Sequence, residues 1–202
     1  MERLMRIVLA SRNEGKLREL RQLFAALSVT LESQAEHNIP SPPETGTTFV
    51  ENALIKARFS AQQSGLPAIA DDSGIVVPAL DGAPGVYSAR YAGPEASDAD
   101  NNRRLVQALA GSSDRRAYYY CVIVLMRHGE DPAPLITTGS WWGEVIATPA
   151  GAGGFGYDPY FLLPELAQTS AQLSPAHKNE LSHRGQASRA LVALLEQELA
   201  GG

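Results

Sequence analysis

Apolar residues near the start of the chain change from a continuous run to helical spacing. Residues 7–10 form an uninterrupted apolar run, which predicts a short buried strand over 6–10. The apolar positions that follow, from 17 to 27, recur along one face of a helix. Asn13 is a candidate N-cap of that helix, and Glu14 falls in its first turn. The pattern therefore predicts a strand that runs directly into a helix.

The rest of the chain shows the same two patterns. Thr48 and Glu51 have the spacing of a capping box, which predicts a helix from there to about Ser64. A strong strand signal covers 118–126, which is aromatic and β-branched almost throughout. Other strands are predicted at 29–32, 68–70 and 135–145, helices at 97–109 and around 190–198, and loops at 39–46 and 151–159. Helices and strands alternate and strands then cluster, which indicates a mixed α/β architecture in one domain over residues 1–202.

Composition narrows the class of protein. The chain has 202 residues, a formal net charge of −5 and 44% hydrophobic residues. These values allow a sizeable core and exclude a disordered acidic chain. The mild acidity argues against a nucleic-acid partner, because proteins that bind nucleic acid have clustered Lys and Arg.

Cysteine content and hydropathy indicate the compartment. The single cysteine, Cys121, excludes an intrachain disulfide framework and fits a reducing environment. No apolar run approaches the roughly 20 residues of a membrane helix, and the run near the start is too short for a signal peptide. We therefore expect a soluble, cytoplasmic protein with no membrane partner.

Lysine is scarce in this sequence. Only three of the 17 basic residues are lysines, namely Lys16, Lys56 and Lys178. On composition alone, codon bias explains this scarcity. The alternative is that each lysine is retained for its compact ammonium charge, which suits phosphate oxygens.

Two segments at predicted strand ends carry candidate groups for anions and metals. Ser11, Asn13 and Lys16 surround a predicted helix start, whose N–H groups and dipole favour an anion, although ordinary capped helix starts look the same. The spacing is not that of a Walker A loop. Asp71 and Asp72 follow the 68–70 strand, and their mutual repulsion is relieved by Mg²⁺, which takes one or two carboxylates together with substrate phosphates. A turn with two solvated acids explains them equally well.

The glycine-rich loop at 151–159 is a candidate base-binding segment. Glycines let the backbone approach a ligand, Phe155 or Tyr157 can stack on a flat base, and Asp158 can accept hydrogen bonds from base N–H groups. The alternative is a glycine-rich hairpin with an aromatic residue in the core.

A second polar group lies just before the last predicted helix. Lys178, His183 and Arg184 together suit a polar ligand, while Ser182 is also a candidate N-cap of that helix.

Other kinds of catalytic site are not supported by the sequence. The histidines show no metal-ligand spacing, so a zinc site is not supported. A G-x-S-x-G nucleophile segment is also absent. Cys121 lies in an apolar strand and is expected to be an inert buried thiol.

Taken in order, six segments resemble the non-canonical purine nucleoside triphosphate pyrophosphatases, the inosine/xanthosine triphosphatase or dITP/XTP pyrophosphatase family. The segments are Ser11-x-Asn13-x-x-Lys16-x-x-Glu19, 48–53, 70–74, 82–91, 153–159 and Ser182-His183-Arg184-Gly185. The resemblance covers almost the whole chain. It implies an elongated two-lobed α/β fold with a mixed sheet, an active site in the groove between the lobes, and assembly as a homodimer.

The resemblance also implies an activity and a set of residues. The activity is Mg²⁺-dependent hydrolysis of ITP, dITP and XTP to the nucleoside monophosphate and pyrophosphate, which cleanses the nucleotide pool. Asp72 resembles the Mg²⁺ ligand and proton acceptor, and Glu44 is a second candidate ligand. Because one group cannot fully be both a tight metal ligand and a free base, our hypothesis is that Asp72 mainly holds the metal and that Asp71 or a metal-bound water shares the proton transfer. The candidate triphosphate contacts are Ser11, Arg12, Asn13, Glu14, Gly15, Lys16 and Lys56, with Ser73 beside the substrate. The candidate base pocket consists of Phe155, Gly156, Tyr157, Asp158, Lys178, His183 and Arg184.

Base selection is expected to depend on the 6-oxo group. Lys178, His183 and Arg184 are donors that match an acceptor there, whereas the 6-amino group of adenine would leave them unpaired. The sequence departs from the family pattern at Arg12, where Gly is frequent, and in the 42–46 loop, where the nearest match to an acidic ligand by spacing falls on Pro43 rather than Glu44.

Two other functions remain open from the sequence. One is a related pyrophosphatase acting on other nucleotides, and the other is a nucleotide-binding sensor that no longer hydrolyses its ligand. Intact Asp71, Asp72 and all three lysines argue against the sensor, because binding alone does not need paired acids.

Overall fold

The computed structural model describes residues 5–25 and 29–201. Its strands are β1 (Met5–Leu9), β2 (Val29–Ser33), β3 (Ala68–Val76), β4 (Arg116–Met126), β5 (Leu135–Val145), β6 (Phe161–Leu163) and β7 (Gln168–Thr169). Its α-helices are α1 (Glu14–Leu23), α2 (Phe49–Ser64), α3 (Asp98–Ala108), α4 (Pro175–Leu181) and α5 (His183–Gly201). Short 3₁₀ turns cover Pro78–Leu80, Gly85–Arg90, Asp158–Tyr160, Pro164–Leu166 and Ser170–Gln172.

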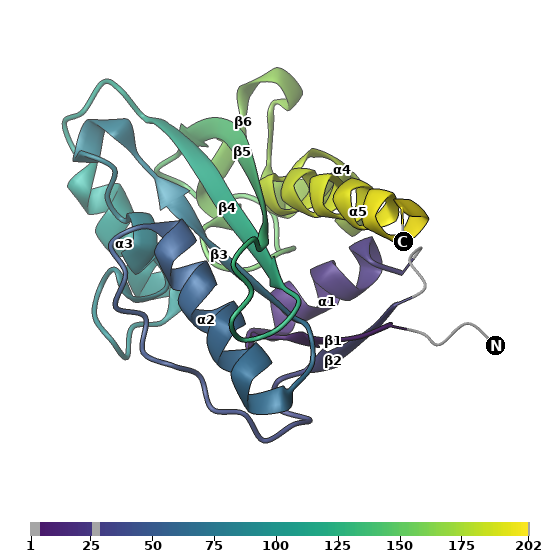
Figure 1. The fold of residues 1–202 in the computed structure, drawn as a ribbon. Coiled ribbons are helices and arrows are strands. Elements are labelled where there is room, and N and C mark those ends of the chain that lie inside the picture. Colours follow the sequence, from purple (N-terminus) through teal and green to yellow (C-terminus); the bar gives the residue numbers. More distant parts are fainter. Residues whose placement is uncertain (1–4, 26–28, 202) are drawn as a thin grey trace. The chain divides into compact units, whose positions relative to one another are not determined.

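The strands form one mixed sheet in the order β2-β1-β3-β4-β5-β6-β7 (Figure 1). Strand β1 pairs in parallel with β2 and β3, whereas β6 pairs antiparallel with β5 and β7. The predicted mixed α/β architecture is therefore confirmed. None of the helices in the described stretches has both the length and the apolar character needed to cross a membrane.

The chain divides into two compact units. The first unit consists of Met1–Asp72, Cys121–Gly139 and Arg184–Gly202, and the second of Ser73–Tyr120 and Ser140–His183. Strands β3, β4 and β5 pass from one unit into the other along the chain. Each unit has a hydrophobic core of its own.

In the first unit, β1 is covered on both faces. Buried leucines of α1, the phenylalanine that follows it and apolar residues of α5 pack against Ile7 and Leu9. Because side chains alternate along a strand, the fully buried Val8 points to the opposite face. Helix α2 contacts β1 and buries small residues one turn apart, which lets the helix approach the sheet closely. The buried alanines are Ala53, Ala57 and Ala61.

In the second unit, aromatic rings fill much of the core. Tyr119 of β4 contacts the rings of Trp141 and Phe161 at centroid distances of 6.5 and 4.5 Å. Leu105 and Leu109, from the end of α3, belong to the same cluster. These contacts fix the strands that precede the glycine-rich loop at 151–159.

The predicted helix starts are confirmed. The side chain of Asn13 accepts a hydrogen bond from the backbone N–H of Lys16 at 3.0 Å, as expected for an N-cap. Thr48 and Glu51 form the capping box, and α2 ends at Ser64 before left-handed Gly65. The predicted apolar position 27 lies outside the described residues.

One local prediction is wrong. The strand expected at 68–70 continues to Val76, because the charges of Asp71 and Asp72 are compensated by cations and do not end it. Gly74 is needed inside this strand, since a Cβ there would lie 2.4 Å from Oγ of Ser88. Helix α5 begins at His183, directly after Ser182, where the sequence predicts the last helix to start, and the segment before Ser182 forms the additional short helix α4 with Ser174 as its N-cap.

Candidate active site

The loop between β1 and α1 lies at the carboxyl end of a parallel strand. Ser11 Oγ accepts a hydrogen bond from the backbone N–H of Asn13 at 3.2 Å, and Asn13 in turn caps the helix. Arg12 and Glu14 are exposed, and Gly15 is half-buried. Ligands of α/β sheets bind outside the carboxyl ends of strands, and a helix start there favours anions. The segment from Ser11 to Lys16 therefore has the geometry of an anion-binding loop.

The register between β1 and β3 brings Asp71 to this loop. Leu9 is opposite Ile69, so the residues after each of them emerge side by side. Asp71 is completely buried, and its Oδ2 lies 3.1 Å from Nζ of Lys16. The guanidinium of Arg184, at the start of α5, donates two hydrogen bonds of 3.2 Å to the same oxygen. Arg184 also donates to Glu19 of α1.

Cations keep Asp71 ionised in spite of its burial. Burial alone raises the pKa of a carboxyl, but the charges of Lys16, Arg184 and Lys56 outweigh it and hold the pKa of Asp71 well below its usual range. Burial opposes the charge of Arg184 in the same way, and the carboxylates of Asp71 and Glu19 raise its pKa. Asp71 and Arg184 are therefore a charged pair at any ordinary pH.

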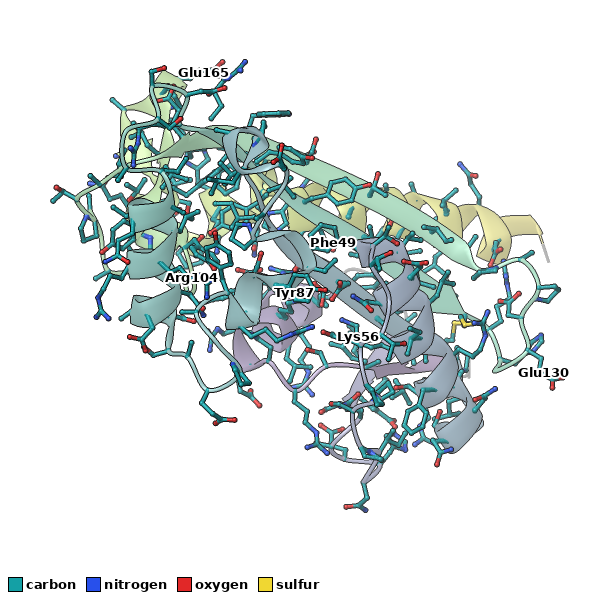
Figure 2. All side chains as sticks on the ribbon, turned by 90° about the vertical axis from the view of Figure 1, so that its left-hand side faces the viewer. Phe49, Lys56, Tyr87, Arg104, Glu130 and Glu165 are labelled. Carbon is teal, nitrogen blue, oxygen red and sulfur yellow. The ribbon has the colours of Figure 1, made fainter. Side chains whose placement is uncertain are left out.

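The neighbouring carboxylate has a different environment. Oδ1 of Asp72 lies 2.7 Å from Nζ of Lys56, and the same ammonium lies 3.0 Å from Oε1 of Glu44. Lys56 also donates to the backbone carbonyl of Asp71 at 2.8 Å. Lys56 is a residue of α2 and is labelled in Figure 2. The Lys56 ammonium thus forms ion pairs with both carboxylates.

The pKa directions of this pair reflect their burial. Burial raises the pKa of Asp72 above its usual range, even though Lys56 and Lys16 oppose this shift. Burial alone would lower the pKa of Lys56, but the carboxylates of Asp72, Asp71 and Glu44 raise it overall. Asp72 is therefore the carboxyl of the two that gains most from additional positive charge.

The donor set fits a divalent cation that binds oxygen. Carboxylate oxygens of Asp72 and Glu44 converge on one point, which the Lys56 ammonium contacts. Mg²⁺ is commonly held by one or two protein carboxylates together with substrate phosphates and water. Among the residues that the structure describes, no group of three or more His, Cys, Asp or Glu side chains is placed to hold a metal.

In the second unit, Asp158 is the centre of a polar network. Its Oδ2 accepts hydrogen bonds from Nζ of Lys178 at 2.7 Å and from the backbone N–H of Phe155 at 2.9 Å. Its Oδ1 accepts hydrogen bonds from the hydroxyls of Ser170 at 2.8 Å and Tyr119 at 3.3 Å. Both oxygens are thus engaged within the protein, whereas the sequence predicts that Asp158 accepts from a base.

A cation and several flat rings lie in contact around this network. The ammonium of Lys178 lies 4.8 Å from the ring centroid of Phe155, within the range of a cation–π contact. The imidazole of His183 stacks on Tyr119, with centroids 4.8 Å apart and planes 9° apart. Tyr157 is buried, and its hydroxyl donates to the carbonyl of Ser88 at 2.7 Å. Phe155 and Lys178 are therefore held by Asp158, a member of the predicted set, whereas His183 stacks on Tyr119, which is outside it.

The sequence-predicted residues fall into two groups. The first unit contains Ser11, Arg12, Asn13, Glu14, Gly15, Lys16, Glu44, Lys56, Asp71, Asp72 and Arg184. The second unit contains Ser73, Phe155, Gly156, Tyr157, Asp158, Lys178 and His183. Ser73 follows Asp72 on β3 and is half-buried.

Sequence reasoning did not assign several residues that contact the site. Asn52 lies one turn before Lys56 on α2, with Nδ2 3.5 Å from Asp72, so helical i,i+4 spacing from Lys56 is a signal that identifies it. Glu19 stands in the first motif without a predicted role. Tyr119 and Ser170 carry no local signal, because they meet Asp158 only through the fold.

The fold and the first unit's site define an α/β protein with a charged cluster at the carboxyl ends of parallel strands. A sequence model of the Ham1 family matches residues 7–194. The chain therefore belongs to the Ham1 family, which confirms the resemblance of its six segments.

Curated relatives and solved structures agree with this assignment. The chain is 57% identical over 192 residues to a dITP/XTP pyrophosphatase of Nitrosomonas europaea, covering 95% of each chain. It is 59% identical to a dITP/XTP pyrophosphatase of Ralstonia nicotianae, covering 94% of this chain and 96% of the relative. The structure of a HAM1 protein from Coxiella burnetii matches with a TM-score of 0.90 and 50% identity, over 96% of this chain and 99% of that one. The Staphylococcus aureus Ham1 protein matches with a TM-score of 0.86 and 41% identity, over 96% and 99%.

Proposed function

We propose that this protein is a nucleoside triphosphate pyrophosphatase that hydrolyses ITP, dITP and XTP to the monophosphate and pyrophosphate and depends on Mg²⁺. The names of its relatives support the reaction and the substrate class. The observation that carries the proposal is the asymmetry of the two acids on β3. Asp71 is compensated by buried cations, whereas Asp72 shares one ammonium with Glu44.

The first unit is proposed to bind the triphosphate. The segment 11–16 offers a helix start and Lys16, and α2 adds Lys56, so two ammonium groups and helix N–H groups are available to phosphate oxygens. Lys56 already bridges two carboxylates, so phosphate binding here exchanges one anionic partner for another. Catalysis of phosphoryl transfer relies mainly on such positioning and charge compensation.

Asp72 and Glu44 are proposed to hold Mg²⁺. When bound, the ion neutralises phosphate charge and polarises the phosphorus. Asp72 is also the better proton acceptor, because its pKa is raised while that of Asp71 is lowered. In the reaction, water adds to the α-phosphorus, its proton passes to Asp72, and the bond from the α-phosphorus to the bridging oxygen breaks as pyrophosphate leaves.

This assignment of metal binding and proton transfer to Asp72 differs from the sequence-based hypothesis. That hypothesis gives Asp72 mainly to the metal and a share of the proton transfer to Asp71 or a metal-bound water. The buried contacts of Asp71 with Lys16 and Arg184 favour a positioning role for it instead.

The second unit is proposed to recognise the base. Lys178 and His183 supply N–H donors for a 6-oxo group, and Phe155 offers a flat ring. An adenine 6-amino group leaves such buried donors without an acceptor, which disfavours ATP. Asp158 is assigned a positioning role, since four donors of the protein occupy its oxygens. The contact of Arg184 with the base stays a prediction.

Pyrophosphate release from ITP, XTP, GTP and ATP, with and without Mg²⁺, tests the proposal. We expect release from ITP and XTP only with the metal, and little from ATP. Equal cleavage of ITP and ATP contradicts the substrate class, and no cleavage of any nucleotide favours the sensor. A homodimer and a cytoplasmic location belong to the same proposal, and analytical ultracentrifugation tests the first of them.

A further inference from the structure

Helix α3 holds the peptide backbone of Gly156 from two directions. The backbone N–H of Gly156 donates to Oδ2 of Asp98 at 2.8 Å, and Nδ2 of Asn102 donates to the carbonyl oxygen of Gly156 at 2.9 Å. The same Nδ2 donates to the carbonyl of Asp98 at 2.8 Å, so the two helix residues are held together. All of these residues belong to the second unit.

The two hydrogen bonds act on consecutive peptide planes. The N–H of Gly156 belongs to the peptide that follows Phe155, and its carbonyl belongs to the peptide that precedes Tyr157. Gly156 adopts φ +62°, in the left-handed region, and a glycine rotates more freely about its backbone bonds than any other residue. Fixing both planes therefore removes the freedom that the glycine would otherwise give to the loop.

The anchoring residues are themselves rigidly placed. Ser97 and Asp100 form a capping box at the start of α3, directly beside Asp98. Asn102 is buried, with 5% of its surface exposed. The helix end opposite the loop is packed into the core by Leu105. The contact with Gly156 therefore combines an exposed residue at a capped helix start, Asp98, with a buried residue of the same helix, Asn102.

Beyond Gly156, the loop carries the groups proposed to recognise the base. The N–H of Phe155 donates to Asp158, which accepts from Lys178, whose ammonium faces the ring of Phe155. A rotation at Gly156 would move Phe155 and Asp158 relative to each other and release Lys178 from its place. The geometry of the base-binding groups thus depends on contacts with a helix that has no predicted role in binding.

We propose that Asp98 and Asn102 are positioning residues for base selection, acting through the backbone of Gly156 on Phe155 and Lys178. This proposal rests on the proposed function and extends it to residues outside the predicted site. Their side chains bind the protein backbone rather than the nucleotide, so they act on specificity by limiting the conformations of the loop.

The test compares two pairs of variants of the full-length protein. Asp98→Ala removes the acceptor of the Gly156 N–H, whereas Asp98→Asn keeps an oxygen that accepts it. Asn102→Ala removes the donor to the Gly156 carbonyl. Asn101→Ala is the matched control, because Asn101 is also buried on α3 but bonds to Ala89 and Ala92. Asp98 is exposed, so its variants are expected to fold even if Asn102→Ala does not.

Two measurements test the mobility of the loop and the selection of the base separately. The first is hydrogen–deuterium exchange of the peptide spanning 151–158 in the free protein, which needs no substrate. We expect faster exchange in Asp98→Ala and Asn102→Ala, and exchange like that of the unchanged protein in Asp98→Asn and Asn101→Ala. Unchanged exchange in both Asp98→Ala and Asn102→Ala overturns the proposal at its first step.

The second readout is the ratio of kcat/KM for ITP to that for ATP. Loss of one hydrogen bond that orders the site is expected to raise KM for ITP about tenfold, lower the ITP:ATP ratio about tenfold and change kcat little. Asp98→Asn is expected to retain the ratio of the unchanged protein. Faster exchange with an unchanged ratio overturns the specificity role. An unchanged protein that cleaves no purine triphosphate refutes the proposed function, and with it the specificity role, whatever the exchange shows.

Discussion

Nζ of Lys56 lies 2.7 Å from Oδ1 of Asp72, and the two residues come from different elements, α2 and β3. Both side chains are largely buried, and the ammonium also contacts Glu44. A buried cation between two carboxylates is costly unless its partners are well placed. The arrangement therefore marks Asp72 and Glu44 as the acidic pair on which the proposed chemistry depends.

Removal of the Asp72 carboxylate is expected to abolish most of the activity. Asp72→Asn removes a proton acceptor and a proposed metal ligand, so kcat is expected to fall by at least about 10²–10⁴-fold. Glu44→Gln is expected to keep measurable activity and to require more Mg²⁺ for half-maximal rate. Pyrophosphate release across a Mg²⁺ titration measures both effects. Glu130→Gln, at an exposed position of the first unit labelled in Figure 2, is the control, and a similar loss in all three variants contradicts the assignment.

Substitution of the two acids of β3 is expected to affect stability differently. Asp71→Asn leaves the buried cations Lys16 and Arg184 with less negative charge, which is expected to cost about 3–5 kcal/mol and about 10 °C in Tm. The folded-state pKa of Asp72 is raised, so its ionised form opposes folding at neutral pH, and Asp72→Asn is expected to leave Tm unchanged or raise it. Calorimetry of both variants at neutral pH measures this contrast. A lower Tm in Asp72→Asn than in Asp71→Asn would contradict the prediction that the charge of Asp71 is better compensated than that of Asp72.

The ion pair between β1 and β2 predicts a pH dependence of stability. A hydrogen bond from Arg6 lowers the pKa of Glu32 from 4.5 to about 2, and His37 also contributes. Because the folded pKa lies below the unfolded one, the contribution of Glu32 is complete above about pH 4.5 and is lost as the pH falls toward 2. The difference in unfolding free energy between the unchanged protein and Glu32→Gln is expected to shrink over this range.

Urea denaturation between pH 7 and pH 2.5 measures that difference. Glu36→Gln is the control, since Glu36 pairs with Arg21 where both side chains are about half exposed, and such pairs contribute little. A difference for Glu32→Gln that is constant over the whole pH range refutes the prediction.

The single cysteine is expected to be unreactive in the folded protein. Cys121 is completely buried, and burial together with the nearby charge of Asp71 raises the pKa of its thiol to about 12. Because the thiolate is the reactive form, Ellman's reagent at pH 8 is expected to modify the protein only after denaturation. Rapid modification of the native protein would show that the first unit opens readily around β4.

Gly154 is expected to be essential for the shape of the glycine-rich loop. It has φ +73°, and a Cβ there would lie 2.0 Å from Oδ2 of Asp158, so alanine displaces the carboxylate that holds Lys178. Gly111 has a similar φ of +87° with open space around it, so Gly111→Ala is a control for backbone strain alone, at about 1–2 kcal/mol. We expect Gly154→Ala to raise KM for ITP and Gly111→Ala to leave it unchanged. Equal KM values for the two variants contradict the role of the Asp158 network.

Local features of this fold are predictable from the sequence. The N-cap at Asn13 and the capping box at Thr48 and Glu51 depend on contacts within three residues, so adjacent sequence is sufficient to specify them. The strand at 135–145 has the predicted bounds for a similar reason, since it alternates exposed and buried positions. Six separated motifs were likewise sufficient to identify the family, because their order is itself specific.

Only the tertiary structure decided which charges meet. The pairs Lys56–Asp72, Lys178–Asp158 and Arg184–Asp71 are 16, 20 and 113 residues apart. Whether two such groups touch depends on strand register and helix packing, which local propensity does not encode. The residues proposed to carry the chemistry are therefore recognisable from the sequence. The packing of β1, β3, α1, α2 and α5 decided that buried cations compensate Asp71, whereas Asp72 shares one ammonium with Glu44. The physical reason is that burial makes an unpaired charge costly, so the final partners are selected by the folded chain as a whole.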